Sequence, residues 1–290
     1  KVIEDELIGV REKFGDERKT EIEYSAEEMN AEDFYADDPM IITISHFGYI
    51  KRTPLIEYRT QARGGVGAKG SETRDEDFIE RVFEATNHNY MLFFTEQGRC
   101  YWLRVFEIPE GSKNSKGRAI QNLLNLGPDN RVQAIIRVTK LKDPEYNESH
   151  NIVFATKNGV VKKTALKEYS RPRTNGVIAI NLLENDQLID AVLTEGDSEI
   201  ILANKNGRAI RFNENQVRNM GRPSTGVKGM TLDGPEDGIV GMICMRTGAN
   251  DNVLVVSEKG MGKRSELDDY RITHRGGKGV KTSTSTEKTG

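Results

Sequence analysis

Pairs of cationic side chains recur at one spacing in this 290-residue sequence, and their chemistry is that of phosphate binding. In three places the pair stands three and four residues after a glycine that closes an apolar run. These pairs are Lys51 and Arg52, Lys162 and Lys163, and Lys263 and Arg264. Ammonium and guanidinium groups bind phosphate oxygens without a covalent step, so the pattern favours a track of phosphate contacts over a catalytic centre.

Two further copies of the pattern vary it. The fourth copy has Arg208 and Arg211, one and four residues after Gly207. Lysine and arginine are common on any solvated strand, so a single basic pair is better interpreted as part of a solvent-exposed strand face with no binding role. Agreement at one offset in four copies of five shifts the preference toward a phosphate-binding band. The second copy departs from the others and carries Arg99, Tyr101, Trp102 and Arg104.

A second set of glycines, 17 to 19 residues after the first set, also stands beside cations. Glycine lets the main chain approach a phosphate and offer its N–H groups, and arginine adds a charged fork. Turn formation also accounts for these glycines, so their repetition beside the basic pairs is the informative feature. The cations are Arg63, Lys69, Lys113, Lys116, Arg118, Arg171, Arg173, Arg218, Arg222, Lys228, Arg271, Arg275, Lys278 and Lys281.

Other chemistry has little support in the residue pattern. The four histidines, His46, His88, His150 and His274, are dispersed without the spacing of metal ligands, and neither a nucleophile with a base nor a P-loop is recognisable. We therefore expect no catalytic residue, metal site or cofactor in this stretch. Three tyrosines recur ten residues after their glycines, which predicts a packing role: Tyr58, Tyr169 and Tyr270.

The elements that must position these cations are β-hairpins. The first glycines stand 50, 61, 48 and 53 residues apart, and each follows an apolar, β-rich run such as MIITIS or NVLVV. A period near 50 residues made of strands predicts an all-β, radial propeller and not a helical solenoid. The hairpin glycines are Gly48, Gly98, Gly159, Gly207 and Gly260.

The N-terminal stretch differs in kind. Apolar Ile3, Leu7, Val10 and Phe14 are spaced as one stripe of a charged helix, and Gly15 is suited to ending it. An acidic segment follows and reads as a linker. We expect a helix and linker at 1–39 and a β domain at 40–290, with blades near 40–70, 90–126, 151–183, 199–232 and 252–290.

Charge and cysteine content agree with this division. The formal net charge of −3 splits into −9 for residues 1–39 and +6 for residues 40–290, so the repeats are mildly basic. Cys100 and Cys244 occupy unrelated repeat positions, which predicts buried free thiols. With neither a signal peptide nor a long apolar run recognisable, we expect a cytoplasmic protein.

Several phrases together resemble a known family. YIKRTPLIEYRTQARGGVG is similar to the first blade of the C-terminal domain of the bacterial DNA gyrase A protein, and QARGGVG falls on that family's seven-residue box. VIEDELIGVREKFGDERKTEI resembles the helix that leaves the breakage-reunion core of that protein. FATKNGVVKKTALKEYSRPRTNGVIAI, VRNMGRPSTGVKG and GMGKRSELDDY fit later blades, so the resemblance covers nearly the whole chain.

The resemblance implies a six-bladed β-pinwheel whose blades exchange strands, with five repeats visible here and the sixth blade missing from the sequence. Such a domain, itself non-catalytic, wraps duplex DNA around a basic rim and presents a positively crossed segment for strand passage. The whole enzyme would be an ATP- and Mg-dependent type II topoisomerase, an A2B2 assembly with the gyrase B protein that introduces negative supercoils. The resemblance places the DNA-binding box at Gln61, Ala62, Arg63, Gly64, Gly65, Val66 and Gly67.

With the repeat pattern, the resemblance places a DNA-binding rim on eighteen cations. They are Lys51, Arg52, Lys69, Arg99, Arg104, Arg118, Lys162, Lys163, Arg171, Arg173, Arg208, Arg211, Arg222, Lys228, Lys263, Arg264, Arg275 and Lys278.

The box departs from the family pattern, because Ala62 and Val66 stand where basic residues are usual and Arg63 is its only cation. If wrapping needs the box as a charge cluster, this box is weak; if the box is a glycine-built strap, the change does little harm. We favour the strap. The alternatives are the equivalent subunit of topoisomerase IV, a propeller for protein interaction, and an independent enzyme, which the scattered histidines disfavour.

Overall fold

The computed structural model describes residues 1–17, 19–20, 30–58, 76–127 and 130–284. The chain forms two compact units, Lys1–Phe34 and Tyr35–Gly290. The first contains the predicted helix, α1 (Val2–Phe14), and a short 3₁₀ turn, η1 (Ala31–Phe34). Gly15 ends α1, its N–H donating to the carbonyl oxygen of Arg11. Among the described residues, no helix has the length and apolar character needed to cross a bilayer.

The second unit is built from β-hairpins, as the glycine spacing predicts. The five turn glycines have φ between 75° and 83°, the left-handed region that glycine reaches without strain. The hairpins are β1 (Pro39–Ser45) with β2 (Tyr49–Pro54), β4 (Tyr90–Thr95) with β5 (Arg99–Arg104), β8 (Asn151–Thr156) with β9 (Val160–Ala165), β12 (Ser198–Asn204) with β13 (Arg208–Asn213), and β16 (Asn252–Val256) with β17 (Gly262–Glu266).

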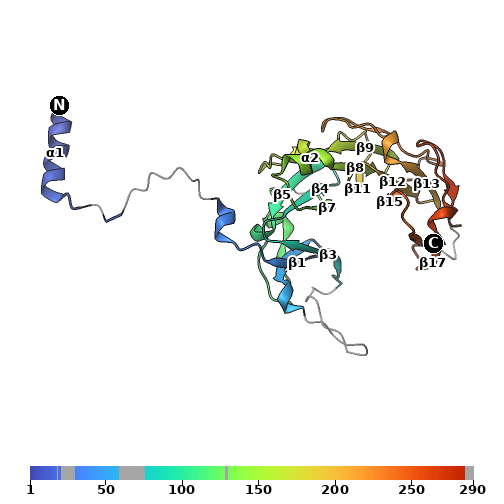
Figure 1. The fold of residues 1–290 in the computed structure, drawn as a ribbon, viewed down its shortest axis with the longest axis horizontal. Coiled ribbons are helices and arrows are strands. Elements are labelled where there is room, and N and C mark those ends of the chain that lie inside the picture. Colours follow the sequence, from blue (N-terminus) through green and yellow to red (C-terminus); the bar gives the residue numbers. More distant parts are fainter. Residues whose placement is uncertain (18, 21–29, 59–75, 128–129, 285–290) are drawn as a thin grey trace. The chain divides into compact units, whose positions relative to one another are not determined.

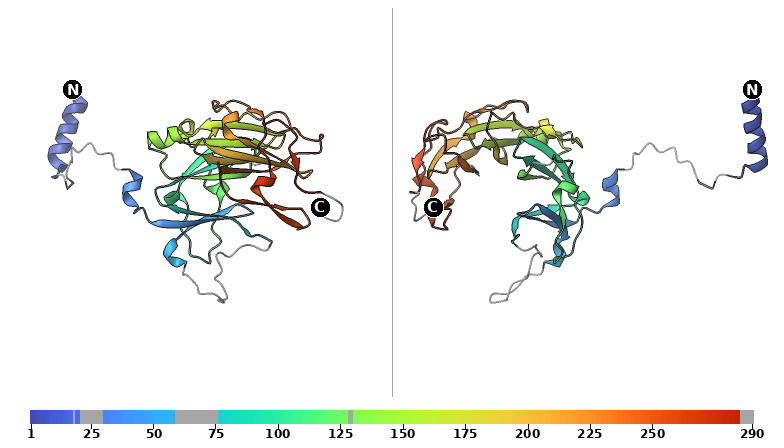
Figure 2. Two further views of the ribbon diagram at one scale, coloured as in Figure 1. Left: turned by 45° about the vertical axis from the view of Figure 1, so that its right-hand side comes forward. Right: turned by 180° about the vertical axis from the view of Figure 1, so that it is seen from behind.

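Four hairpins gain a third strand on one edge and a short fourth strand on the other. The third strands are β3 (Ile79–Thr86), β7 (Val132–Val138), β11 (Leu188–Thr194) and β15 (Ile239–Arg246), and β7, β11 and β15 lie side by side. The opposite edges therefore form the outside of the array. Figure 1 shows the sheets of this unit following one another along a curve, and Figure 2 shows them from two further directions.

The fourth strand of each complete sheet comes from the next repeat. It is β6 (Arg118–Ala119), β10 (Val177–Ile178), β14 (Val227–Lys228) or β18 (Val280–Lys281), paired with β2, β5, β9 or β13. This exchange is the expected pinwheel arrangement, and it is confirmed for four sheets. The β16–β17 sheet has two strands in the described part of the chain.

Short 3₁₀ turns follow the second strand of every hairpin. They are η2 (Leu55–Glu57), η3 (Val105–Glu107), η5 (Leu166–Tyr169), η6 (Glu214–Gln216) and η7 (Leu267–Asp269); η4 (Ile120–Asn122) and the helix α2 (Pro144–Ser149) lie between blades.

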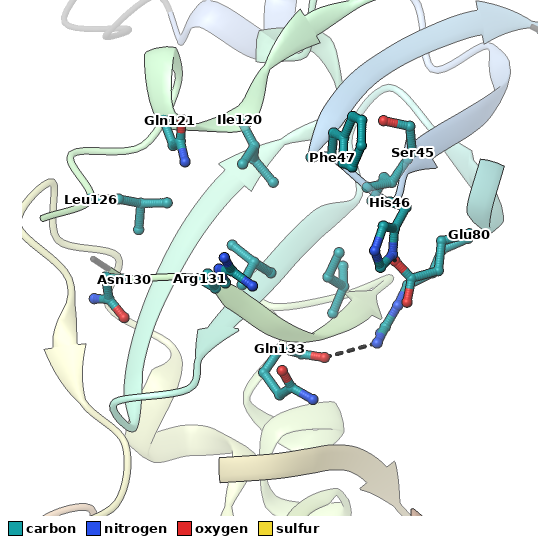
Figure 3. Close-up of a pocket in the computed structure, with 15 residues that line it drawn as sticks. Ser45, His46, Phe47, Glu80, Ile120, Gln121, Leu126, Asn130, Arg131 and Gln133 are labelled. Atoms are coloured by element: carbon teal, nitrogen blue, oxygen red, sulfur yellow. Dashed lines mark hydrogen bonds and ion pairs between the residues drawn. The ribbon is translucent and has the colours of Figure 1, made fainter. Parts of the chain in front are cut away.

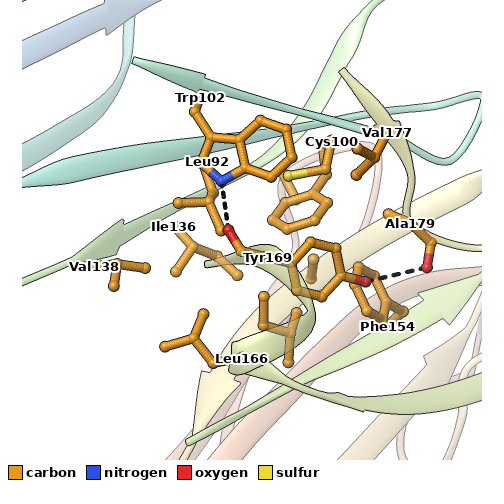
Figure 4. Packing of buried hydrophobic residues seen from close by; sticks show 14 of the residues in the cluster. Leu92, Cys100, Trp102, Ile136, Val138, Phe154, Leu166, Tyr169, Val177 and Ala179 are labelled. Carbon is orange, nitrogen blue, oxygen red and sulfur yellow. Dashed lines mark hydrogen bonds between the residues drawn. The ribbon is translucent and has the colours of Figure 1, made fainter. Parts of the chain in front are cut away.

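Apolar clusters fill the spaces between successive sheets. In the cluster drawn in Figure 4, Phe94 and Phe154 pack edge-on at 5.3 Å, and Tyr169 lies beside both rings. Tyr169 and Tyr270 are buried, so the predicted packing role is confirmed for these two; Tyr58, the third, is only half-buried. Cys100 is a buried free thiol, as expected, whereas Cys244 is free but only partly buried. Because each cluster joins two repeats, the blades cannot pack separately.

Candidate nucleic-acid interface

In three of the five repeats, the cation four residues after the hairpin glycine binds the following repeat. Arg211 donates from its guanidinium to the carbonyl oxygens of Leu267 (2.8 Å) and Tyr270 (3.0 Å) in the next 3₁₀ turn, and it also pairs with Glu199. Arg52 makes the same kind of contact in the first repeat, donating to the carbonyl oxygen of Ile108 at 2.8 Å. We call this contact the clasp.

The clasp is also present where the residue four positions after the glycine is not arginine. Lys163 donates to the carbonyl oxygen of Glu214 at 3.3 Å, and its Nζ lies 3.6 Å from the carboxylate of the same residue. Trp102, which replaces the cation in the second repeat, donates its indole N–H to the carbonyl oxygen of Tyr169 at 3.0 Å (Figure 4). An indole N–H therefore replaces the ammonium or guanidinium donor at this junction.

Lysines three residues after the glycine are buried beneath the next repeat's glycine loop. Lys51 donates from Nζ to the carbonyl oxygens of Ser112 (3.0 Å), Lys113 (2.7 Å) and Ser115 (3.0 Å). Burial lowers the pKa of Lys51, and the nearby Glu57 opposes this shift.

Lys162 is placed in the same way. Its Nζ donates to the carbonyl oxygens of Ala179 (2.6 Å) and Arg222. Burial lowers its pKa from 10.5 to about 7; the charge of Arg222 adds to the shift, and Glu168 opposes it.

These positions correct the expected rim. Lys51, Arg52, Lys162, Lys163 and Arg211 are each at most 7% exposed, and their donor groups are bound by protein oxygens. The prediction that they face solvent is wrong, because the exchanged strand and 3₁₀ turn of the next repeat cover this side of the hairpin. The fifth copy differs: Lys263 and Arg264, on β17, are exposed.

The glycine loops are straps between neighbouring sheets. Gly117, Gly176 and Gly226 have positive φ, and a Cβ at any of them would lie 2.6–2.8 Å from a carbonyl oxygen of the hairpin strand that the strap joins. These glycines are therefore needed for close approach of two main chains. Turn formation and close contact account for them without a phosphate.

Five predicted rim arginines are half-buried, and two of them bind main-chain oxygens at the straps. Arg99 donates to the carbonyl oxygen of Asn175 at 2.8 Å, and Arg275 donates to those of Gln216 (2.9 Å) and Lys228 (2.9 Å). The other three contact side chains: Arg104 lies over the Tyr90 and Phe106 rings, Arg208 pairs with Asp233 at 2.9 Å, and Arg222 lies 3.9 Å from Glu168.

The remaining predicted cations on the straps are exposed. Lys278 is paired with Asp233 at 3.0 Å. The others, with further strap cations that the sequence also singles out, have no carboxylate partner in the described part of the chain. They are Arg118, Arg171, Arg173 and Lys228, with Lys116, Arg218, Arg271 and Lys281.

The predicted box, Gln61 to Gly67, lies outside the described residues, as does Lys69.

A pocket of about 440 Å³, not predicted from the sequence, lies beside the first hairpin turn (Figure 3). Two contacts join polar groups of its lining. Arg81 donates to the carbonyl oxygen of Gln133 at 2.8 Å, and the His46 ring lies 3.3 Å from Glu80 and stacks on Phe78. Within the described residues, no cluster of three His, Cys, Asp or Glu side chains suits a metal ion.

Comparison with known proteins gives one consistent result. The family model described as "DNA gyrase C-terminal domain, beta-propeller" matches residues 39–84, 89–139, 150–195, 198–244 and 251–288, which confirms five repeats. The DNA gyrase A protein of Staphylococcus aureus strain MRSA252 is 43% identical over 291 residues, which cover 100% of this chain and 32% of the relative. The chain thus spans about a third of the length of the curated relatives it matches.

Two solved structures have the same fold. The C-terminal domain of DNA topoisomerase IV matches with a TM-score of 0.70 and 30% identity, covering 84% of this chain and 72% of that one. A DNA gyrase A C-terminal domain matches with a TM-score of 0.67 and 26% identity, covering 87% and 80%.

Proposed function

Because the chain belongs to the DNA gyrase C-terminal domain family, we propose that it binds duplex DNA and bends it around the outer edges of its sheets. The contacts are to backbone phosphates and do not depend on base sequence. The domain carries out no chemical step itself.

One observation supports this proposal most strongly. Straps from four successive repeats each place exposed lysine or arginine side chains beside the outer strand of a sheet. A row of such cations follows a curved array of sheets (Figure 1) and suits the regularly spaced charges of a duplex backbone. The proposed contacts are Lys116, Arg118, Arg171, Arg173, Arg218, Lys228, Arg271, Lys278 and Lys281.

Many contacts are required, because bending a 20–30 bp site through 40–90° costs on the order of 1–6 kcal/mol. Only phosphate contacts distributed over several repeats can offset a longer wrap. Lys263 and Arg264 are left out of this set, because the equivalent side chains in the other repeats bind protein.

For the box, we propose the strap role that the described glycine loops have. Glycine at the close contacts is then its essential feature, and Ala62 and Val66 leave that feature intact. Arg63 and Lys69 would add exposed charge to the same strap.

We propose further that the whole protein is the gyrase A protein, which acts with the gyrase B protein in an A2B2 assembly to introduce negative supercoils. ATP and Mg²⁺ would act on other parts of that assembly, in the cytoplasm. The topoisomerase IV neighbour makes the equivalent subunit of that enzyme the second candidate. Identity of 43% over the whole chain to the gyrase A protein supports gyrase.

Salt dependence tests the binding mode. We expect the logarithm of the affinity for a mixed-sequence duplex to fall linearly with the logarithm of salt concentration, by about 0.9 per phosphate contacted. Fluorescence anisotropy between about 50 and 200 mM salt measures this slope. A slope near zero, or a strong preference for one sequence, would overturn the proposal.

The slope of DNA affinity against salt concentration also distinguishes a DNA-binding propeller from a propeller that binds another protein. If the exposed strap cations serve another protein, Lys228→Ala leaves the DNA slope unchanged. If they serve DNA, the slope falls by about one contact. Lys140→Ala, an exposed lysine outside the straps, is the matched control and should change little.

A further inference from the structure

The two buried lysines beneath the straps, Lys51 of β2 and Lys162 of β9, make the same kind of contact with the strap main chain. Nζ of Lys51 binds the carbonyl oxygen of Lys113, and Nζ of Lys162 binds that of Arg222. Lys113 and Arg222 occupy the same place in their repeats, 15 residues after the hairpin glycine. In both repeats, then, a buried ammonium group is hydrogen-bonded to the main chain of a strap cation.

The other repeats show that the position tolerates residues without an amine. Tyr101 and Ile210 stand where Lys51 and Lys162 stand, and both are buried. A lysine is costly there, because burial removes water from its ammonium group. Its cost suggests a role beyond filling space.

The strap residue that lies over each of these four positions explains why only two of them are lysine. The strap residue over Tyr101 is Thr174. Threonine carries no charge, so this strap has no cation to orient at that position. Over Ile210 the strap has Arg275, whose guanidinium is held by the carbonyl oxygens of Gln216 and Lys228. Arg275 is thus held by hydrogen bonds of its own guanidinium, whereas Lys113 and Arg222 are held through a lysine bound to their main chain.

We propose that Lys51 and Lys162 are positioning residues of the DNA-binding surface. Each holds the main chain of a strap from beneath, and so orients the half-buried Lys113 or Arg222 as a phosphate contact in addition to the exposed strap cations. This inference rests on the proposed function. Arg222 and Lys162 repel each other, so the Lys162 ammonium group also favours an outward guanidinium at Arg222. An anion bound at Arg222 relieves that repulsion.

A double-mutant cycle at the second strap tests the inference. Lys162→Met removes the ammonium group, Arg222→Ala removes the cation it positions, and Lys140→Met is a matched control. Each of the first two should weaken duplex binding by about one phosphate contact, roughly tenfold near 0.1 M salt. The double variant should be no weaker than Arg222→Ala, because both changes remove the same contact.

Proton uptake supplies a readout that a purely structural role would not move. The charged groups that act on Nζ are Glu168 of η5 and Arg222 of the strap. Tyr169 of η5 lies beside Nζ, because its hydroxyl donates to the same carbonyl oxygen of Ala179, and Cys100 of β5 lies near Tyr169. Since the charge of Arg222 helps to hold the pKa of Lys162 near 7, phosphate binding there should raise it. Calorimetry in buffers of different ionisation enthalpy should show proton uptake on DNA binding near pH 7 in the wild type and less in Lys162→Met.

The outcomes separate the two proposals. If the wild type binds no DNA, the proposed function fails. If the wild type binds and the losses multiply in the double variant, or if Lys162→Met keeps full affinity and proton uptake, the positioning role is overturned. Lys51→Met with Lys113→Ala repeats the cycle at an independent strap, should Lys162→Met prevent folding.

Discussion

At the residue scale, one side-chain type has two roles in this chain. Arg211 is buried and binds a carboxylate and two carbonyl oxygens, whereas Arg264 at the same offset is exposed. The two arginines differ because the 3₁₀ turn of the next repeat covers Arg211 on β13, whereas Arg264 on β17 is not covered in the described part of the chain. A clasp is a contact between repeats, and its donor can be guanidinium, ammonium or indole.

Removing a clasp should destabilise the fold much more than removing its exposed equivalent. Arg211→Met leaves the buried carboxylate of Glu199 without its partner, and we expect a loss of about 3–5 kcal/mol in the free energy of unfolding. Arg264→Met should change it by no more than about 0.5 kcal/mol. Urea denaturation of the two variants measures both values. Equal losses would contradict the assignment of the clasp.

The buried Lys162 should make stability depend on pH. Its pKa in the folded chain is about 7 against an ordinary 10.5, so between these values the unfolded chain binds a proton that the folded chain does not. Stability should therefore rise with pH through this window on account of Lys162, and the contribution should level off below pH 7. In Lys162→Met that rise should be absent, as measured by urea denaturation near pH 7 and near pH 9.5. A variant with the wild-type pH dependence would show that Lys162 titrates normally.

At the element scale, the strap is the unit that joins neighbouring blades. It contributes the outer strand, passes close to a hairpin strand at a glycine, and carries the exposed cations. Asp233 pairs with two cations, Arg208 and Lys278, so this strap has less unpaired charge than the row of cations suggests.

A side chain at a strap glycine should disturb the junction. Gly226 has a φ of 109°, and a Cβ there would lie 2.7 Å from the carbonyl oxygen of Val161. Gly226→Ala should cost about 1–3 kcal/mol through backbone strain, with some addition from the steric contact. Gly241→Ala is the control, because no atom lies within 4 Å of its Cβ and its φ is not positive. Thermal unfolding compares the two, and similar midpoints would contradict the close-approach role.

At the scale of the whole molecule, curvature comes from the succession of sheets and charge comes from their straps. DNA that follows several straps must bend. If its path also coils out of one plane, a closed circle changes its linking number when it is nicked and resealed. The number of engaged straps thus sets the topological effect.

Removing charge from one strap should reduce that effect without unfolding the domain. For the double variant Arg171→Ala and Arg173→Ala, the protein concentration needed for a given shift in linking number should rise about tenfold or more near 0.1 M salt. Gel electrophoresis of plasmid ligated in the presence of the chain measures the shift. The exposed pair Lys140→Ala and Lys205→Ala controls for lost charge, and an equal effect there would reject a localised path.

The amino-acid sequence by itself determined the repeat, the hairpins, the turn glycines and the family. These depend on local patterns, since an apolar run closed by a glycine specifies a hairpin wherever it occurs. The packing tyrosines followed from the same regular spacing.

Only the tertiary structure decided which cations face solvent. Arg52 is covered in part by residues distant in the chain, such as Ile108, which is 56 positions later, and no local pattern carries that information. Strand exchange lays each strap over the preceding repeat, so burial of Lys51, Lys162 and Lys163 is a property of two repeats together. A basic band that looks continuous in the sequence is therefore divided by the fold into buried clasps and exposed strap cations.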